Sequence, residues 1–152
     1  MYQRILVPLE GKGGPEAHVR HAAQLAKEEG AELTLLRVIT VVPSDEYFFK
    51  RLQVEEGSKA AKSKGEAEAY VAQLAQELKA QGVDAKPEVV ISDQAEDEAI
   101  VAHAAEMGAH LIVLPNQRRS LFSRWLQGNV RAKVQRRADI PVLTVQEKRD
   151  EE

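Results

Sequence analysis

The chain has 152 residues, of which 43% are hydrophobic and 30% charged, with a net charge of −3 and no cysteine. This length fits one domain whose core is large enough to fold without a disulfide or a metal. Without cysteine, disulfides, thiolate zinc ligands and a cysteine nucleophile are all excluded. The apolar runs are much shorter than the ~20 residues of a membrane span, and the N-terminus has no signal-peptide pattern. We therefore expect a cytoplasmic protein without a membrane partner.

The first half of the chain predicts two strands, one helix and a long crossover. Residues 5–9 and 33–39 are short apolar runs without strict alternation, which is typical of strands covered on both faces. Apolar residues at helical spacing follow Pro15, and Gly30 offers a left-handed stop. The polar stretch over residues 41–65 is too long for an ordinary connection, so we predict a mobile loop or lid there.

The second half repeats the alternation of helix and strand. Helical patterns end at Gly82, at Gly108 and before Pro141, and the strand-like runs cover residues 87–91, 111–114 and 141–145. Strands that alternate with helices form βαβ units and a mostly parallel sheet. We predict a doubly wound α/β fold, in which residues 1–146 form a single domain with five strands and helices on both faces. Residues 147–152 are predicted to be a charged C-terminal tail.

In an open parallel sheet, ligands bind beyond the carboxyl ends of the strands, where the winding reverses. The loops after the first and the fourth strand, which begin at Glu10 and Pro115, are therefore the predicted site. From 116 to 138 the chain has seven basic residues and no acid: Arg118, Arg119, Arg124, Arg131, Lys133, Arg136 and Arg137. This cluster either attracts an anion to the site or consists of solvated charges, with Arg136 and Arg137 complementing a helix C-terminus.

Several segments of the chain resemble the universal stress protein family, in order and at family-like spacings. They are residues 5–8 with an acid two positions on, 30–38, 108–113, and the C-terminal stretch from Arg119 to Val145. The resemblance covers essentially the whole chain. It implies a Rossmann-like five-stranded sheet in a homodimer, with the last strand, residues 141–145, at the interface. The family has ATP-binding and non-binding branches.

The ATP-binding branch of that family carries two loop glycines and, farther on, a glycine followed by Ser or Thr. At these positions the chain has Pro115, Arg118, Gly128 and Asn129, so both loop glycines are missing. Side chains there block the close approach of backbone to phosphate, and Pro115 has no N–H to offer. Glu10 replaces the usual Asp, so the chain resembles a branch with a degenerate ATP-binding motif. If a nucleotide binds, the implied contacts are Leu9, Glu10, Val38, Leu114, Pro115, Arg118, Gly128, Asn129 and Val130.

We predict a stress-response or regulatory protein that acts as a dimer through an unidentified protein partner. It binds ATP weakly or not at all, holds no metal and is not an enzyme. The alternative is a module for ATP or AMP, in which Arg118 and the helix start at Asn129 hold the phosphates, which share Mg²⁺. Slow ATP hydrolysis is a third hypothesis, without an evident catalytic base. The net charge of −3 argues against a nucleic-acid partner.

Four further features have both a functional and a structural interpretation. His18 and His21 share a helix face and could hold a metal with a third ligand, but we expect surface histidines. His110 is expected to play a structural role at the entry to the fourth strand. The acids at 96–98 fit the positive end of a helix dipole better than an acid–base pair. Trp125 is expected to pack against the domain or across the dimer rather than on single-stranded nucleic acid.

Overall fold

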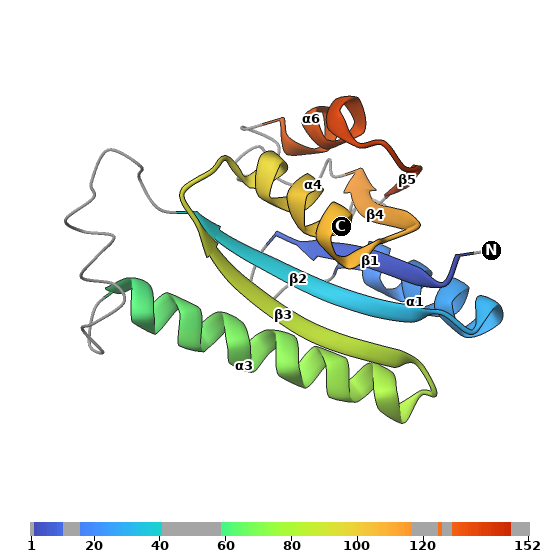
Figure 1. The fold of residues 1–152 in the computed structure, drawn as a ribbon. Helices are drawn as coiled ribbons and strands as arrows, with labels where there is room; N and C mark the ends of the chain where they lie inside the picture. Colours follow the sequence, from blue (N-terminus) through green and yellow to red (C-terminus); the bar gives the residue numbers. More distant parts are fainter. Residues whose placement is uncertain (1, 11–15, 41–58, 117–124, 126–128, 147–152) are drawn as a thin grey trace, which may run out of the picture.

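A parallel sheet in the strand order β3-β2-β1-β4-β5 forms the centre of the fold (Figure 1). The computed structural model describes residues 2–10, 16–40, 59–116, 125 and 129–146. The strands are β1 (Arg4–Leu9), β2 (Glu32–Thr40), β3 (Asp84–Ser92), β4 (Leu111–Asn116) and β5 (Val142–Gln146). Because the chain winds from β1 toward β3 on one side and toward β5 on the other, the predicted doubly wound α/β fold is confirmed.

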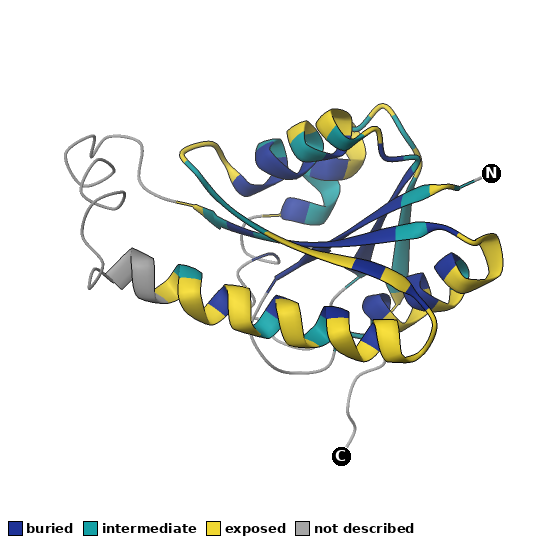
Figure 2. Ribbon diagram, turned by 60° about the horizontal axis from the view of Figure 1, so that its bottom comes forward, coloured by how far each residue is buried: buried dark blue, intermediate teal, exposed yellow. Residues whose placement is uncertain are grey.

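Among the described residues, two helices cover each face of the sheet. They are α1 (Ala17–Glu29) and α3 (Lys59–Ala80) on one face, and α4 (Glu96–Met107) and α6 (Val130–Arg137) on the other. The side chains of β1 alternate between the two buried clusters, with Ile5, Val7 and Leu9 in the first and Leu6 in the second. Figure 2 shows these buried strands between helices whose outer faces are exposed.

Glycines end α1 and α4 where the sequence predicts. Gly30 and Gly108 both have a φ of 67°, a left-handed conformation that glycine adopts without a Cβ penalty. The N–H of Gly30 donates to the carbonyl of Ala26, which satisfies one of the open carbonyls at the end of α1. The chain can then turn at once into β2, so α1 and the neighbouring strands are held in fixed positions around the end of β1.

Two elements begin earlier than predicted. β3 begins at Asp84 instead of 87, because an edge strand can expose Asp84 and Lys86 while it buries Ala85, and this alternation interrupts the apolar run. α3 begins at Lys59, so residues 59–65 of the predicted loop are helical. The residues in this stretch are mostly good helix formers, but they do not form an apolar stripe. Helical periodicity therefore does not reveal this part of the helix.

The rest of the predicted loop, residues 41–58, lies outside the described residues. α3 has 22 residues. Neither it nor any other helix in the described ranges is long and apolar enough to cross a membrane.

β4 is longer than predicted and includes Pro115. The strand continues through Asn116, because Pro115 and Asn116 pair with Val145 and Gln146 of β5. The amide of Asn116 also donates to the side-chain carbonyl of Gln146 at 3.1 Å. Pro115 is therefore a buried residue of the sheet and not the first residue of a loop.

Candidate functional site at the switch point

The two flanks of β1 are paired differently. Toward β2, six residue pairs cover the whole strand, from Arg4 to Leu9. Toward β4, the paired residues are Ile5 and Leu6, so the ladder ends three residues before β1 does. The carboxyl ends of β1 and β4, beyond this point, are the position where doubly wound folds bind ligands.

At the end of β1, His18 of α1 forms a hydrogen bond with the carbonyl of Pro8, a residue that is not paired with β4. Its Nε2 lies 2.8 Å from the carbonyl oxygen of Pro8, a residue without an N–H. The ring is fully buried, and its Nδ1 has no hydrogen-bond partner in the described part of the chain. We therefore assign a neutral ring that donates from Nε2. Burial lowers the pKa of His18 to about 4, against the opposing effects of the Pro8 carbonyl and the Glu10 charge.

The expectation of a surface histidine is wrong for His18 but holds for His21. α1 turns His18 toward the sheet, next to Val19 and Ala22, whereas His21 is exposed. The two rings therefore do not face the same environment. Among the described residues, no group of three or more His, Cys, Asp or Glu side chains could hold a metal ion.

Glu10 directly follows β1 and binds the backbone of Trp125. The N–H of Trp125 donates to Oε2 of Glu10 at 2.9 Å, and both residues are buried, with 4% of Trp125 and 8% of Glu10 exposed. Trp125 belongs to the connection between β4 and α6. This hydrogen bond therefore joins the two strands at the switch point where their backbone ladder has ended.

A second carboxylate holds the indole ring of Trp125. The Nε1–H donates to Oε2 of Glu96 at 2.7 Å, and Glu96 is the buried first residue of α4. Hydrogen bonds to carboxylates are stronger than neutral ones, and more so away from water. The expected packing of Trp125 against the domain is confirmed, whereas its two carboxylate partners were not predicted.

Four of the predicted nucleotide contacts are linked to Trp125, by a shared buried cluster or by a hydrogen bond. Val38, Leu114 and Val130 belong to the same buried cluster as the tryptophan, and Glu10 accepts its backbone N–H. These residues come from β2, β4, α6 and the end of β1. Three of the residues that the resemblance implies as nucleotide contacts are therefore in the same buried cluster as Trp125, and a fourth is hydrogen-bonded to it.

Among the other predicted contacts, those that the structure describes do not join this cluster. Leu9 lies in the cluster on the opposite face of the sheet, and Pro115 is a buried residue of β4. Asn129 precedes α6 with a φ of 54°, and its side chain makes no capping hydrogen bond. Asn129 is thus the N-cap of α6 by position, and its left-handed backbone explains why the side chain makes no capping hydrogen bond within the described residues, since an N-cap side chain reaches the first turn from an extended backbone. Arg118 and Gly128 lie outside the described residues.

A third carboxylate fixes the backbone of Glu10. Glu16 accepts the N–H of Glu10 at 3.4 Å and the hydroxyl of Tyr70, on α3, at 2.6 Å. Burial and the neighbouring Glu16 carboxylate both raise the pKa of the Tyr70 hydroxyl. Glu10 is thus held through its main chain by Glu16 and through its side chain by Trp125.

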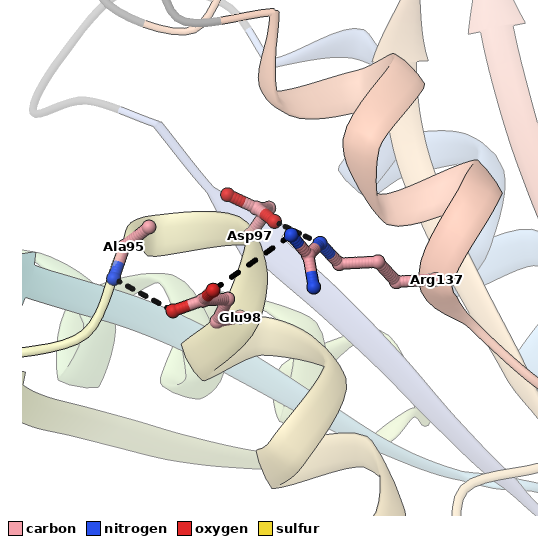
Figure 3. A network of polar contacts seen from close by, with 4 residues as sticks. All are labelled: Ala95, Asp97, Glu98 and Arg137. Carbon is pink, nitrogen blue, oxygen red and sulfur yellow. Dashed lines mark hydrogen bonds and ion pairs between the residues drawn. The ribbon is translucent and has the colours of Figure 1, made fainter.

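The acids at the start of α4 also bind α6 (Figure 3). Nε of Arg137 lies 2.9 Å from Oδ2 of Asp97, and its NH2 group lies 3.8 Å from Glu98. Asp97 is buried and Arg137 is half-exposed, and their contact is an ion pair without a hydrogen bond at Oδ2. Glu98 also accepts the N–H of Ala95 at 3.4 Å. The acids predicted only to complement a helix dipole therefore connect α4 to α6, and Arg137 does more than complement the end of its own helix.

His110 has the structural role that we expected. Its Nδ1 accepts the N–H groups of Gln3 at 3.2 Å and Arg4 at 3.1 Å, directly before β4 begins. The ring therefore ties the beginning of β1 to the beginning of β4, at the opposite end of these strands from Trp125.

The strand order and the switch point between β1 and β4 define a doubly wound α/β domain of the Rossmann-like type. The sequence pattern of the universal stress protein family matches residues 1–146, and the chain belongs to that family. The resemblance drawn from the sequence is confirmed at this level.

Individual relatives agree with this assignment. The universal stress protein MJ0531 of Methanocaldococcus jannaschii is 28% identical over 158 residues, which cover 99% of this chain and 86% of the relative. The solved structure of the hypothetical protein MJ0577 has a TM-score of 0.77 at 26% identity and covers 99% of both chains. A universal stress protein in complex with cAMP has a TM-score of 0.63 at 25% identity, over 95% of this chain and 97% of the other.

Proposed function

We propose that this protein is a cytoplasmic stress-response or regulatory member of its family, which acts as a homodimer on a protein partner and binds ATP weakly or not at all. The observation that carries the proposal is the position of Trp125. Its ring shares a buried cluster with Val38, Leu114 and Val130, where the family resemblance implies nucleotide contacts. A nucleotide bound in the family manner has to displace this side chain first.

The displacement is energetically unfavourable. Removal of a buried tryptophan from its packing costs about 3–5 kcal/mol, and every 1.4 kcal/mol weakens binding about tenfold. A nucleotide would also have to replace the indole N–H that donates to the buried Glu96 carboxylate. Both effects lower the affinity for ATP, in the same direction as the missing loop glycines.

The homodimer proposal is supported by the two edges of the sheet. β3 carries Pro87 and charged side chains at 84, 86 and 88, which discourage pairing with another strand. β5 has the sequence VLTVQ, without a charge or a proline. In the described sheet each of these strands has one neighbour, so β5 is the edge suited to a second copy of the chain.

Sedimentation velocity tests the dimer. We expect a dimer for the unmodified chain and a shift to monomer for Thr144→Lys, which places a charge on β5. The matched variant Glu88→Lys, on β3, should stay dimeric. A dimer that survives Thr144→Lys and dissociates with Glu88→Lys would contradict the assignment of the interface.

We also propose that the protein is not an enzyme, because the acids at the start of α4 already have structural partners. Glu96 accepts the indole N–H of Trp125, whereas Asp97 and Glu98 form ion pairs with Arg137. The three acids lie on one helical turn. A general acid or base must instead reach the substrate proton that it transfers.

An alternative function is the binding of ATP or AMP with Mg²⁺ through a modified phosphate loop. The structural similarity to a universal stress protein in complex with cAMP favours it, as do the basic side chains of α6. In that function Glu10, Val38, Arg118, Gly128, Asn129 and Val130 would hold the nucleotide.

Calorimetric titration of MgATP into the purified protein separates the two functions. We expect no saturable binding below about 1 mM, which corresponds to a binding free energy weaker than about 4 kcal/mol. The nucleotide content of the protein after purification is the second measurement, and we expect it to be far below stoichiometric. A micromolar Kd or one bound nucleotide per chain would establish the alternative.

A further inference from the structure

We propose that a groove between α4 and the connection from α6 to β5, together with the basic side chains of α6, docks a short acidic segment of a partner protein. The segment places one aliphatic side chain in the groove and its carboxylates on α6. The inference rests on the proposed function, in which the protein acts on a protein partner. It deepens that function by naming the surface and the chemistry of the segment that binds there.

The groove has a volume of about 260 Å³ and two walls. One wall is α4, with Ala105 and, at the end of the helix, Gly108, and the other is the segment 138–140. Because alanine and glycine carry at most one side-chain carbon, the wall of α4 leaves the space open. Among the described residues that line the groove, Asp139 alone is charged. Pockets for drug-sized ligands have roughly 300–1,000 Å³, so this groove suits a single aliphatic side chain.

The groove is remote from the switch point. Gly108 and Ala109 directly precede β4, and Ile140 precedes β5, whereas Trp125 follows β4. The groove therefore lies toward the amino ends of these strands, at the opposite end from the implied nucleotide contacts. A partner segment can occupy it without displacing Trp125.

α6 supplies positive charge beside the groove. It lies next to α4 on the same face of the sheet (Figure 1), and its eight residues include two arginines directly before Ala138, where the second wall begins. Its basic residues are Arg131, Lys133, Arg136 and Arg137, and it has no acid. Within the described part of the chain, only Arg137 is ion-paired. Unpaired charge of one sign on a surface favours a partner of the opposite charge.

The surroundings favour a short acidic segment over a long polyanion. Glu106 of α4 and Asp139 are both exposed, next to or within the lining of the groove. Nucleic acid binds through many phosphates and would meet these carboxylates. The eight residues of α6 extend about 12 Å, which matches three or four residues of an extended chain. The acids of the segment can therefore stay on α6 while its aliphatic side chain enters the groove.

Peptides test this chemistry on the full-length protein. The probe is a labelled peptide with one leucine flanked on each side by a pair of glutamates, and its binding is measured by fluorescence anisotropy. We expect saturable binding with a Kd below about 1 mM. The same peptide with serine in place of leucine should bind about tenfold more weakly, because it buries no aliphatic side chain. Equal affinity of the two peptides, or no saturable binding of the leucine peptide, would overturn the proposal.

The groove is tested by filling it. Ala105→Leu places an aliphatic side chain in the groove and should weaken the leucine peptide about tenfold, to the level of the serine peptide. Ala102→Leu, at an exposed position of α4 outside the lining, should leave the affinity unchanged. If both variants bind the leucine peptide like the unmodified protein, the groove does not receive its side chain.

Charge reversal tests the role of α6. Arg136→Glu should weaken both peptides severalfold, whereas Lys79→Glu, at an exposed position of α3, changes the net charge equally and should weaken neither. Equal losses in Arg136→Glu and Lys79→Glu would show that the peptides respond to net charge and not to this surface.

Two other occupants of the surface give different results. Oligothymidylate that binds more tightly than the leucine peptide and loses this affinity in Arg136→Glu would assign the surface to nucleic acid and contradict the proposal. In sedimentation velocity, Ala105→Leu should have the same oligomeric state as the unmodified protein. Dissociation of a dimer by Ala105→Leu would instead assign the groove to a second copy of the chain.

Titration with MgATP separates the failure of this inference from the failure of the proposed function. If MgATP does not bind and the leucine peptide also fails to bind, the absence of a nucleotide function stands and only the docking surface is refuted. If MgATP binds with a micromolar Kd, the proposed function is wrong, and the peptide measurements decide separately whether the surface exists.

Discussion

The backbone groups on the two sides of β1 are hydrogen-bonded in different ways. Toward β2, six residue pairs satisfy the backbone along the whole strand. Toward β4 the backbone ladder ends at Leu6. Beyond it, side chains make the hydrogen bonds: His18 bonds to the carbonyl of Pro8, and Glu10 accepts the N–H of Trp125. Buried backbone groups require partners. Where the ladder between β1 and β4 ends, buried polar side chains supply these partners.

Among the variants that test these side-chain contacts, Trp125→Ala should have the largest effect on the free energy of unfolding. The variant removes a ring that is 4% exposed and leaves the Glu96 carboxylate without the indole donor. We expect a loss of about 3–5 kcal/mol in the free energy of unfolding, measured by urea denaturation. Trp125→Phe, which keeps a ring but lacks the N–H, should lose about 1–3 kcal/mol. A loss below about 1 kcal/mol in Trp125→Ala would mean that the ring contributes little packing at the switch point.

The second largest effect is the pH dependence of the free energy of unfolding that His18 causes. Its folded pKa of about 4 lies below the unfolded value of 6.5, so the neutral ring is the form that the fold stabilises. Its contribution is therefore present above pH 6.5 and is lost as the pH falls toward 4, by about 3 kcal/mol in total.

Denaturation between pH 7 and 4 measures this contribution as a difference between variants. The unmodified protein should lose about 3 kcal/mol more than His18→Gln, which cannot titrate. His21→Gln, an exposed position on the same helix, should follow the unmodified protein. Parallel pH curves for His18→Gln and the unmodified protein would show that the buried ring is not neutral as assigned.

A smaller effect is expected for Glu10→Ala. The variant leaves the buried N–H of Trp125 without its acceptor, at a cost of about 2 kcal/mol in the free energy of unfolding. Glu10→Gln keeps an acceptor oxygen at nearly the same place and should lose about 1 kcal/mol. If Glu10→Ala and Glu10→Gln are equally stable in urea denaturation, the Trp125 hydrogen bond does not contribute.

The smallest effect is expected at the contact between α4 and α6. Arg137→Ala leaves Asp97 buried without its cation, but Arg137 is half-exposed, so the expected loss is only about 1 kcal/mol. Arg136→Ala, its exposed neighbour, should change the free energy of unfolding by less than about 0.5 kcal/mol. Equal losses in thermal or urea denaturation would show that the ion pair is not specific.

Local periodicity predicted the sheet and helices, whereas the polar contacts at the switch point depend on residues far apart in the sequence. Glu10 and Trp125 are separated by 115 residues, and Trp125 and Glu96 by 29. No spacing rule connects them. The acids of α4 were assigned to the helix dipole because each also fits that role locally.

Two other differences concern residues whose local sequence leaves the outcome undecided. His18 and His21 share a helical spacing, and only the packing of α1 on the sheet decides which of them is buried. Pro115 is typical of a loop, but the pairing of β4 with β5 extends the strand past it. In both cases tertiary contacts determine the outcome.

The indole N–H resonance of Trp125 tests the central claim most directly. The chain has one tryptophan, so a nitrogen–proton correlation spectrum contains one indole signal. With the N–H bonded to Glu96 in a buried site, we predict exchange with solvent at least about a hundredfold slower than for free indole. We also predict that 1 mM MgATP leaves this signal unchanged. Fast exchange, or a saturable shift of the signal at micromolar MgATP, would contradict the account.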